Sequence, residues 1–208
     1  MVHAERAALI EDLAKLDDEQ WRTPSLCAGW TVHDVAAHLV DTARTTRLGF
    51  VAAMVRARFD FDRQNARGVA RERAGSPQET WERLREVATR TSTPPAPLDT
   101  RLVEEVVHGE DIRRPLGLTR AYPVEAVVRA LRLQARTPAT FGGAKERVAG
   151  LRLVATDTDL TLGEAGPPKG ESADGSEVRG SALALLLAVC GRPVPPDALS
   201  GPGAGALT

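Results

Sequence analysis

Histidines and carboxylates are the side chains of this sequence whose spacing could bind a metal ion. The four histidines are His3, His33, His38 and His108. Glu104 and His108 stand four residues apart in an apolar stretch, so a helix would place them one above the other on a single face. Glu105 and Asp111 each lie three residues from His108, and spacing alone does not choose among these carboxylates. A solvated helix carrying acids and one histidine would show the same pattern.

His38 is the histidine that could complete such a site. Its sequence neighbours on both sides are apolar, and a lone histidine in that setting is most often a core residue with satisfied hydrogen bonds. His3, near the terminus, and His33, in the first turn of a helix, are expected to be solvated. In a helical bundle, facing helices direct ligands into the core. His38 with Glu104 and His108 would then supply three ligands, typical of a catalytic zinc site with an open position, and able to hold nickel or ferrous iron.

Four helices of bundle length are predicted to position these side chains. The apolar spacing predicts helices over residues 5–21, 32–59, 77–91 and 98–114. Thr31 followed by Asp34, and Ser76 followed by Pro77, are typical helix starts, because the hydroxyl accepts hydrogen bonds from the first free N–H groups. The arginine-rich segment over residues 60–75 is expected to be a polar connection.

In the C-terminal third of the sequence, the helical spacing of apolar residues gives way to a mixture of helix and strand patterns. A fifth helix is predicted over residues 124–136, and a β-hairpin over 150–156 and 160–163. A Gly/Pro/Ser-rich loop over 164–176 precedes an apolar helix over 181–190, and the tail over 201–205 is expected to be loosely ordered. The predicted fold is therefore mainly α, with a metal-binding helical bundle over residues 1–140 and a small α+β domain over residues 148–208.

Composition excludes several classes of protein. The formal net charge of −1 lacks the basic excess of a general nucleic-acid binder. The longest apolar run, within residues 181–190, is far shorter than the roughly 20 residues of a membrane span. The start of the chain lacks the basic and apolar regions of a secretion signal. Cys27 and Cys190 form neither a metal-pair spacing nor a disulfide framework, so a cytoplasmic protein with no membrane and no nucleic-acid partner is expected.

Three motifs together make the chain recognisable. They are Gly-Trp-Thr-Val-x-Asp-x-x-x-His at residues 29–38, Glu-x-x-x-His at 104–108, and Val-Arg-Gly-Ser at 178–181 with Gly-Arg at 191–192. The chain resembles, over nearly its whole length, the mycothiol-dependent maleylpyruvate isomerase family of the DinB-like superfamily. The resemblance implies a DinB-like four-helix bundle followed by a smaller C-terminal domain. It also implies that His38, Glu104 and His108 bind zinc or another divalent metal, and so it prefers Glu104 to Glu105.

The same resemblance implies a divalent-metal-dependent enzyme with mycothiol as cosubstrate. Such an enzyme would perform S-transfer or cis–trans isomerisation on a small electrophile, as a monomer or homodimer. A metal-dependent hydrolase and a metal-binding protein without catalysis are the alternatives. In the isomerases an arginine of the C-terminal domain contributes to catalysis. Arg179 and Arg192 lie in that region, and neither is matched, so the catalytic residues stay unassigned.

Three residues near the first motif have ordinary structural explanations. Cys27, in the loop before Trp30, is expected to be a small packing residue. Trp30 is expected to pack against Val35 as a hydrophobic staple rather than to wall a pocket. Asp34 could accept a hydrogen bond from the imidazole of His38, but its capping role explains it without a metal.

Overall fold

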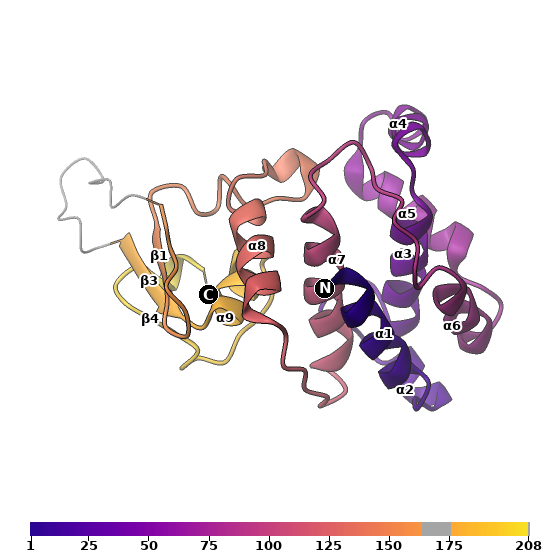
Figure 1. The fold of residues 1–208 in the computed structure, drawn as a ribbon, viewed down its shortest axis with the longest axis horizontal. Helices are drawn as coiled ribbons and strands as arrows, with labels where there is room; N and C mark the ends of the chain where they lie inside the picture. Colours follow the sequence, from indigo (N-terminus) through magenta and orange to yellow (C-terminus); the bar gives the residue numbers. More distant parts are fainter. Residues whose placement is uncertain (164–175, 208) are drawn as a thin grey trace. The chain divides into compact units, whose positions relative to one another are not determined.

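The computed structural model describes residues 1–163 and 176–207, and the chain divides into two compact units, Met1–Tyr122 and Pro123–Thr208. Helices make up the first unit, and the second combines helices with a small sheet (Figure 1). The mainly α fold class with a small α+β part is thus confirmed. The expected domain limits, 1–140 and 148–208, stay a prediction, because compactness in space does not by itself define a domain.

Four helices of the first unit form a bundle. They are α1 (Val2–Leu13), α3 (Val32–Arg44), α6 (Pro77–Glu86) and α7 (Thr100–Arg113). Both α1 and α3 pack against α6 and α7, which closes the ring. These are the four bundle helices that the apolar spacing predicts. Each contributes a fully buried or nearly fully buried apolar side chain to one core, namely Leu9, Leu39, Leu84 and Ile112.

Internal caps make two of these helices shorter than expected. The predicted helix over 5–21 divides where Asp17 forms a capping box, and the predicted helix over 32–59 divides where Thr46 caps a new helix. A side-chain oxygen that satisfies the first free N–H groups starts a helix wherever it stands. The additional helices are α2 (Asp18–Arg22) and α4 (Arg47–Arg56). Thr31 and Asp34 form the predicted capping box at the start of α3.

The arginine-rich segment expected to be a polar connection is instead helix α5 (Phe61–Glu72), capped by Asp60. This helix packs against α3. Gly68 permits the close approach, because a Cβ atom at this position would lie 2.2 Å from Asp41 Oδ2. The prediction was wrong because the buried face of α5 is narrow, with Val69 as its buried apolar side chain.

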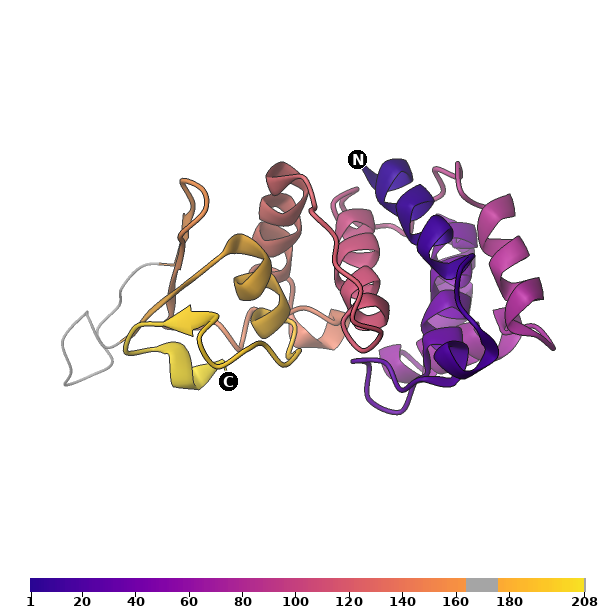
Figure 2. The ribbon, with the colours of Figure 1, turned by 90° about the horizontal axis from the view of Figure 1, so that it is seen from below.

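The second unit contains α8 (Val124–Gln134) and α9 (Ala182–Val189), which pack together. Figure 2 shows these two helices side by side. The sheet of this unit has the order β2-β1-β3-β4. The strands are β1 (Arg152–Ala155), β2 (Thr161–Leu162), β3 (Glu177–Gly180) and β4 (Leu199–Ser200). β1 pairs antiparallel with β2 and parallel with β3, and β4 pairs antiparallel with β3.

These elements confirm three sequence predictions for the second unit and add to them. The fifth helix, the hairpin of β1 with β2, and the apolar helix α9 all occur where they were expected. The strands β3 and β4 were not predicted, because segments this short carry little period-two pattern. The tail contains a short 3-10 helix, η3 (Ala204–Ala206), and another, η1 (Ala139–Phe141), follows α8. The expected loop over 164–176 lies, except for its last residue, outside the described residues.

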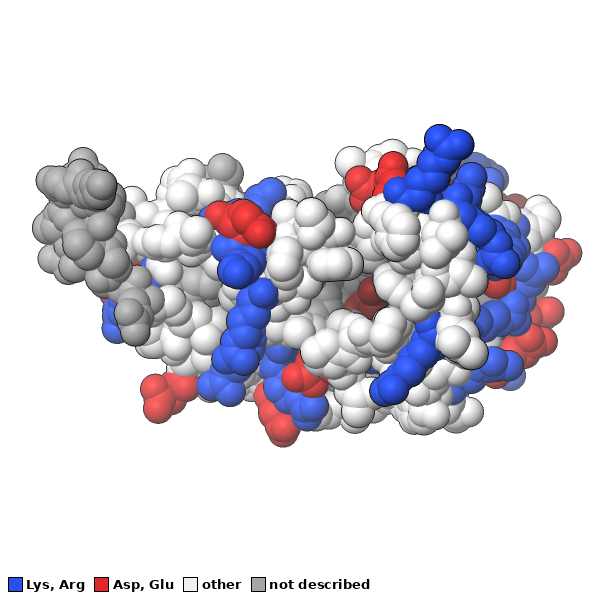
Figure 3. All heavy atoms as spheres, turned by 90° about the horizontal axis from the view of Figure 1, so that it is seen from above, with Lys and Arg blue, Asp and Glu red and all other residues white. Residues whose placement is uncertain are grey.

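Surface properties agree with the absence of a basic excess in the sequence. In the parts of the chain that the structure describes, every helix is too short or too polar to cross a bilayer. On the face drawn in Figure 3, acidic side chains are interspersed among the basic side chains of the first unit.

A buried ion pair joins α1 to α7. Arg6 Nε and Nη2 donate to Glu105 Oε1 at 2.8 and 2.6 Å, and both side chains are only 1% exposed. Arg6 Nη1 donates to the carbonyl oxygens of Val87 and Ala88 at 3.0 and 3.2 Å. The guanidinium group thus ties the end of α6 as well as α7 to α1. Removing one partner of such a pair leaves a charge in the core without compensation.

We expect Arg6→Met to lower the free energy of unfolding by about 3–5 kcal/mol, because Glu105 would remain buried without its cation. Urea denaturation followed by tryptophan fluorescence measures the change. The double variant Arg6→Met/Glu105→Leu removes both charges and should recover at least half of the loss. A single variant that unfolds at the same urea concentration as the parent would contradict this assignment.

His33 lies in the core rather than in solvent, contrary to the sequence expectation. It is 6% exposed, and its Nε2 lies 2.7 Å from Thr80 Oγ1. The expectation was wrong because the packing of α6 against α3 covers the first turn of α3. Burial, aided by the positive charge of Arg73, lowers the pKa of His33 below 6.5, whereas Asp34 acts in the opposite direction.

Because the pKa of His33 is lower in the folded chain, the unfolded chain binds the proton more tightly. The stability that neutral His33 contributes is therefore present above the unfolded pKa of about 6.5 and is lost as the pH falls below it. We expect His33→Gln to lose less stability than the parent between about pH 7 and about pH 5.5 in urea titrations. The exposed His3→Gln variant is the control and should follow the parent, and equal pH slopes for all three proteins would refute the prediction.

Candidate functional site

The first side chain of the site, His38, is positioned by α3. The capping box at Thr31 starts this helix, and His38 follows nearly two turns later, 4% exposed. Its ring lies 5.2 Å from the ring of Trp30 between centroids. Trp30 also packs against the apolar core that contains Val35, and the staple contact between these two residues stays a prediction. The same indole therefore covers one side of the histidine, which the sequence analysis considered the less favoured role.

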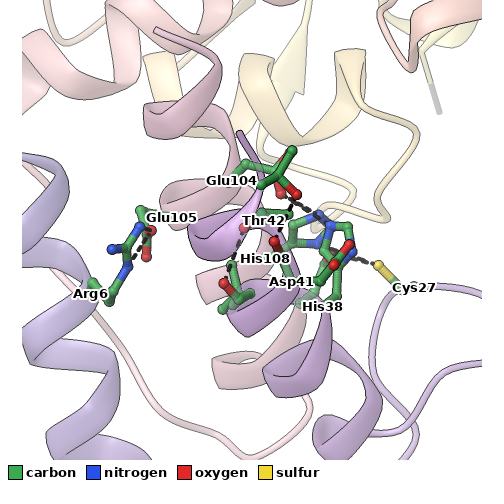
Figure 4. Close-up of polar contacts among 11 residues, drawn as sticks. Arg6, Cys27, His38, Asp41, Thr42, Glu104, Glu105 and His108 are labelled. Carbon is green, nitrogen blue, oxygen red and sulfur yellow. Dashed lines mark hydrogen bonds and ion pairs between the residues drawn. The ribbon is translucent and has the colours of Figure 1, made fainter. Parts of the chain in front are cut away.

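Helix α7 brings Glu104 and His108 to the same place (Figure 4). Glu104 Oε2 lies 3.1 Å from His38 Nε2 and 3.4 Å from His108 Nε2. The two imidazole rings are 4.7 Å apart between centroids and nearly perpendicular. One potential ligand atom from each of the three residues lies within 4.8 Å of the others. The structure thus brings together the three residues that the sequence analysis selected.

The two adjacent glutamates point to different neighbours. Glu104 faces His38, whereas Glu105 faces Arg6 (Figure 4). Consecutive residues on an α-helix are about 100° apart, so only one of the two can share the face of His108. Spacing alone did not distinguish them, because the position of α1, which supplies the arginine, is a tertiary feature.

Asp111, the third carboxylate considered, contacts the other nitrogen of His108. His108 Nδ1 donates to Asp111 Oδ2 at 2.9 Å, and Asp111 is fully buried. Cys27 donates its S–H to the same oxygen at 3.0 Å and lies 3.6 Å from His108 Nδ1. Cys27, His108 and Asp111 thus form a second group with metal-ligand chemistry.

Cys27 packs against the apolar core, as expected of a small packing residue in this loop, and its S–H group makes the additional contact with Asp111. The loop is held against α7 because the backbone N–H of Leu26 donates to the carbonyl oxygen of Asp111 at 3.2 Å. Sequence analysis missed the contact because Cys27 and Asp111 are 84 residues apart. The proximity of Cys27 to the Gly-Trp-Thr-Val motif was the available signal.

Charge reinforces the contacts of Glu104 and His108. Burial alone would raise the pKa of Glu104, but the hydrogen bond from His38 and the charges of His38 and His108 lower it to about 2. Burial alone would lower the pKa of His108, but its hydrogen bonds to Asp111 and Cys27 and nearby negative charge raise it to about 10. Glu104 is therefore an anion beside a protonated His108, and any cation that binds here must displace that proton.

The donor set fits a small divalent cation. Ligands at about 2.0–2.1 Å from a tetrahedral ion lie about 3.3–3.5 Å from one another. The distances of 3.1 and 3.4 Å from Glu104 Oε2 to the two Nε2 atoms are close to that value. Two imidazoles and one carboxylate suit zinc, nickel and ferrous iron. The side chains of Glu104 and His108 are 25% and 16% exposed, against 4% for His38, so solvent reaches the cluster on the α7 side.

The remaining residues considered in the sequence analysis lie elsewhere. His3 is exposed, and His33 contacts Thr80. Asp34 caps α3 and pairs with Arg73 at 2.9 Å rather than with His38. In the second unit, Arg179 pairs with Glu177 at 2.9 Å, and Arg192 donates to the carbonyl oxygen of Cys190 at 2.8 Å.

Comparison with known proteins identifies similar sequences and structures. A family model described as the mycothiol maleylpyruvate isomerase N-terminal domain matches residues 2–134. The crystal structure of the mycothiol-dependent maleylpyruvate isomerase is similar, with a TM-score of 0.64 and 15% identity over 96% of this chain and 89% of that chain. A structure of a histidine-to-alanine mutant of that isomerase is similar to the same extent. No curated protein sequence matches the chain.

The two kinds of match support different statements. At 15% identity the solved structures establish a shared fold only. The family model covers well over half of the chain and includes the whole bundle with its Trp-to-His and Glu-x-x-x-His motifs. The chain therefore belongs to the mycothiol maleylpyruvate isomerase family.

Proposed function

We propose that this protein is a divalent-metal-dependent enzyme that uses a low-molecular-weight thiol, mycothiol or a close analogue, to isomerise or transfer sulfur to a small electrophile. The observation that carries the proposal is the convergence of His38, Glu104 and His108 from two facing helices. Membership of the mycothiol maleylpyruvate isomerase family supports the choice of thiol.

His38, Glu104 and His108 would hold the cation, and zinc is the expected ion. Asp111 supports this role by accepting the Nδ1–H of His108, so that Nε2 is the ring atom that would bind the cation once its proton is displaced. Carboxylate partners of this kind fix the tautomer and the ring orientation of a metal-binding histidine.

A divalent cation at this position would lower the pKa of an adjacent thiol, so that thiolate is available at neutral pH. The thiolate of the cosubstrate adds to a carbon–carbon double bond conjugated to a carbonyl group, and the electron pair moves to the carbonyl oxygen. Rotation about the resulting single bond and expulsion of the thiolate restore the double bond in the other geometry. If the electrophile carries a leaving group, its expulsion completes S-transfer instead.

The residues of this chain favour an external thiol as nucleophile over an internal one. Cys27 donates its S–H to Asp111, so it holds a structural hydrogen bond beside His108. Trp30 covers one side of His38 and limits the approach of water there. The exposed edge of the cluster on the α7 side leaves access for a small ligand.

We expect elemental analysis of the purified protein to find about one divalent metal ion per chain. His38→Ala and Glu104→Gln should lose it, because removing a direct ligand costs more than the about 10–100-fold loss of affinity caused by removing a supporting partner. His3→Ala and Glu19→Gln, both at exposed positions, are the matched controls and should retain the metal. Full occupancy in His38→Ala and Glu104→Gln, with unchanged circular dichroism, would eliminate the site.

Thiol dependence is tested separately with a cobalt-substituted sample. Addition of mycothiol should produce a sulfur-to-metal charge-transfer band, and the His38→Ala variant should not show it. A sample that ignores the thiol but hydrolyses small esters would instead identify a metal-dependent hydrolase. A sample that binds metal and does neither would identify a binding protein.

A further inference from the structure

Cys27, His108 and Asp111 bring three kinds of metal-ligand atom together from two segments of the chain. Cys27 Sγ lies 3.0 Å from Asp111 Oδ2 and 3.6 Å from His108 Nδ1. His108 Nδ1 lies 2.9 Å from the same carboxylate oxygen. These residues form one of two groups of potential metal ligands among the described residues, and the other is the candidate site of His38, Glu104 and His108.

The separations of the three atoms suit an ion that binds sulfur. Zinc lies about 2.3 Å from a thiolate and about 2.0–2.1 Å from a ring nitrogen, so a tetrahedral ion holds these two ligand atoms about 3.5–3.6 Å apart. The observed distance from Cys27 Sγ to His108 Nδ1 is 3.6 Å. The two shorter distances are the hydrogen bonds that Cys27 and His108 donate to Asp111 Oδ2.

A divalent cation would take the place of the two protons in these hydrogen bonds. Cys27 loses its S–H proton and His108 loses its Nδ1–H proton, both to solvent, as the ion enters. The carboxylate oxygen of Asp111 then moves back by about half an ångström to reach bonding distance. Because two positive charges leave as two enter, the exchange adds no uncompensated charge to the interior.

An ion can approach this group from the loop that contains Cys27. Cys27 is partly exposed, and Ala28 and Gly29, which follow it, are exposed. The side chain of His108 is 16% exposed, whereas Asp111 is fully buried. The carboxylate is therefore the inner member of the group, and the other two residues have surface in contact with solvent.

The imidazole ring of His108 belongs to both groups and offers a different nitrogen to each. Its Nδ1 faces Cys27 and Asp111, whereas its Nε2 lies 3.4 Å from Glu104 Oε2. In Figure 4, Cys27 and Glu104 accordingly lie on different sides of the imidazole rings.

This sharing makes the two groups alternatives for a bound ion. A protonated imidazole carries an N–H on each nitrogen, and a neutral imidazole keeps one. An ion on Nδ1 of His108 leaves the remaining proton on Nε2, facing Glu104, where an ion of the candidate site would have to bind. Two ions at once would require a ring that has lost both protons, which is outside the ordinary states of histidine.

We propose that Cys27, His108 and Asp111 form a second cation site, selective for thiophilic divalent ions, and that an ion bound there excludes the ion of the candidate metal site. Thiolate ligands select soft cations, which two imidazoles and a carboxylate do not. The existence of the second site does not depend on the proposed function. Its consequence for activity does, because a thiophilic ion at Cys27 would release the ion on which the thiol chemistry depends.

Cadmium is the probe for the second site, because its bond to a thiolate absorbs in the ultraviolet. Titration of the full chain with cadmium chloride should produce this absorption and saturate at about one ion per chain. Cys27→Ser and Cys27→Ala should abolish it, because neither side chain is a ligand for soft ions. Cys190→Ser removes the other cysteine of the chain, is the matched control, and should keep the absorption. Circular dichroism checks that each variant is folded.

Exclusion is measured on zinc-loaded protein with a zinc-sensitive dye. In the parent and in Cys190→Ser, each cadmium ion that binds with thiolate absorption should release one zinc ion. Zinc release from Cys27→Ser should need at least about tenfold more cadmium, because a direct ligand of the competing site is missing. His38→Ala, which removes a ligand of the candidate site only, should still show the thiolate absorption.

Three results would overturn the proposal. Thiolate absorption that persists in Cys27→Ser would assign the bound ion to Cys190, and cadmium binding to the parent without thiolate absorption would remove Cys27 from the ligands. Zinc that stays bound when the Cys27-dependent absorption is complete would refute exclusion. A parent protein that holds no zinc but shows Cys27-dependent absorption would reject the proposed function and still support the second site.

Discussion

The buried ion pair between Arg6 and Glu105 holds one face of α7 toward α1, and the candidate site depends on that orientation. With Glu105 held toward α1, the next face of α7 presents Glu104 and His108 to α3. A rotation of one residue, about 100°, would exchange the two glutamates and leave His108 without His38. The arginine therefore acts on the site from outside it, through a contact that specifies geometry as well as stability.

Local signals in the sequence predicted most of the helices and the hairpin, but they did not predict α5, β3 or β4, or the contacts between elements. The capping box at Thr31, the proline after Ser76 and the alternating segment before Thr156 correctly predict α3, α6 and the hairpin. The helix α5 was missed, because a mostly polar segment can pack through a narrow face. The helices that were predicted too long contain new caps, which have no effect on the average hydrophobic period.

In the candidate site, too, the sequence predicts which residues stand on a helix but not which residues of other helices they contact. His33 and His38 occupy the same helix and have similar neighbours in sequence, yet one contacts a threonine of α6 and the other meets α7. Spacing made Glu104 a candidate partner of His108, but it did not separate Glu104 from Glu105 or Asp111. The contact of Cys27 with Asp111 could not be predicted, because it joins residues 84 apart in the chain.

His38 and Glu104 are 66 residues apart in the chain and stand on helices that face each other. A shared ion would act as a staple across that long loop, and its binding energy would add to the cohesion of the fold. Without bound metal, the protein would unfold more often, and a larger unfolded population is degraded faster. Its abundance would then follow metal supply, independently of any need for its chemistry.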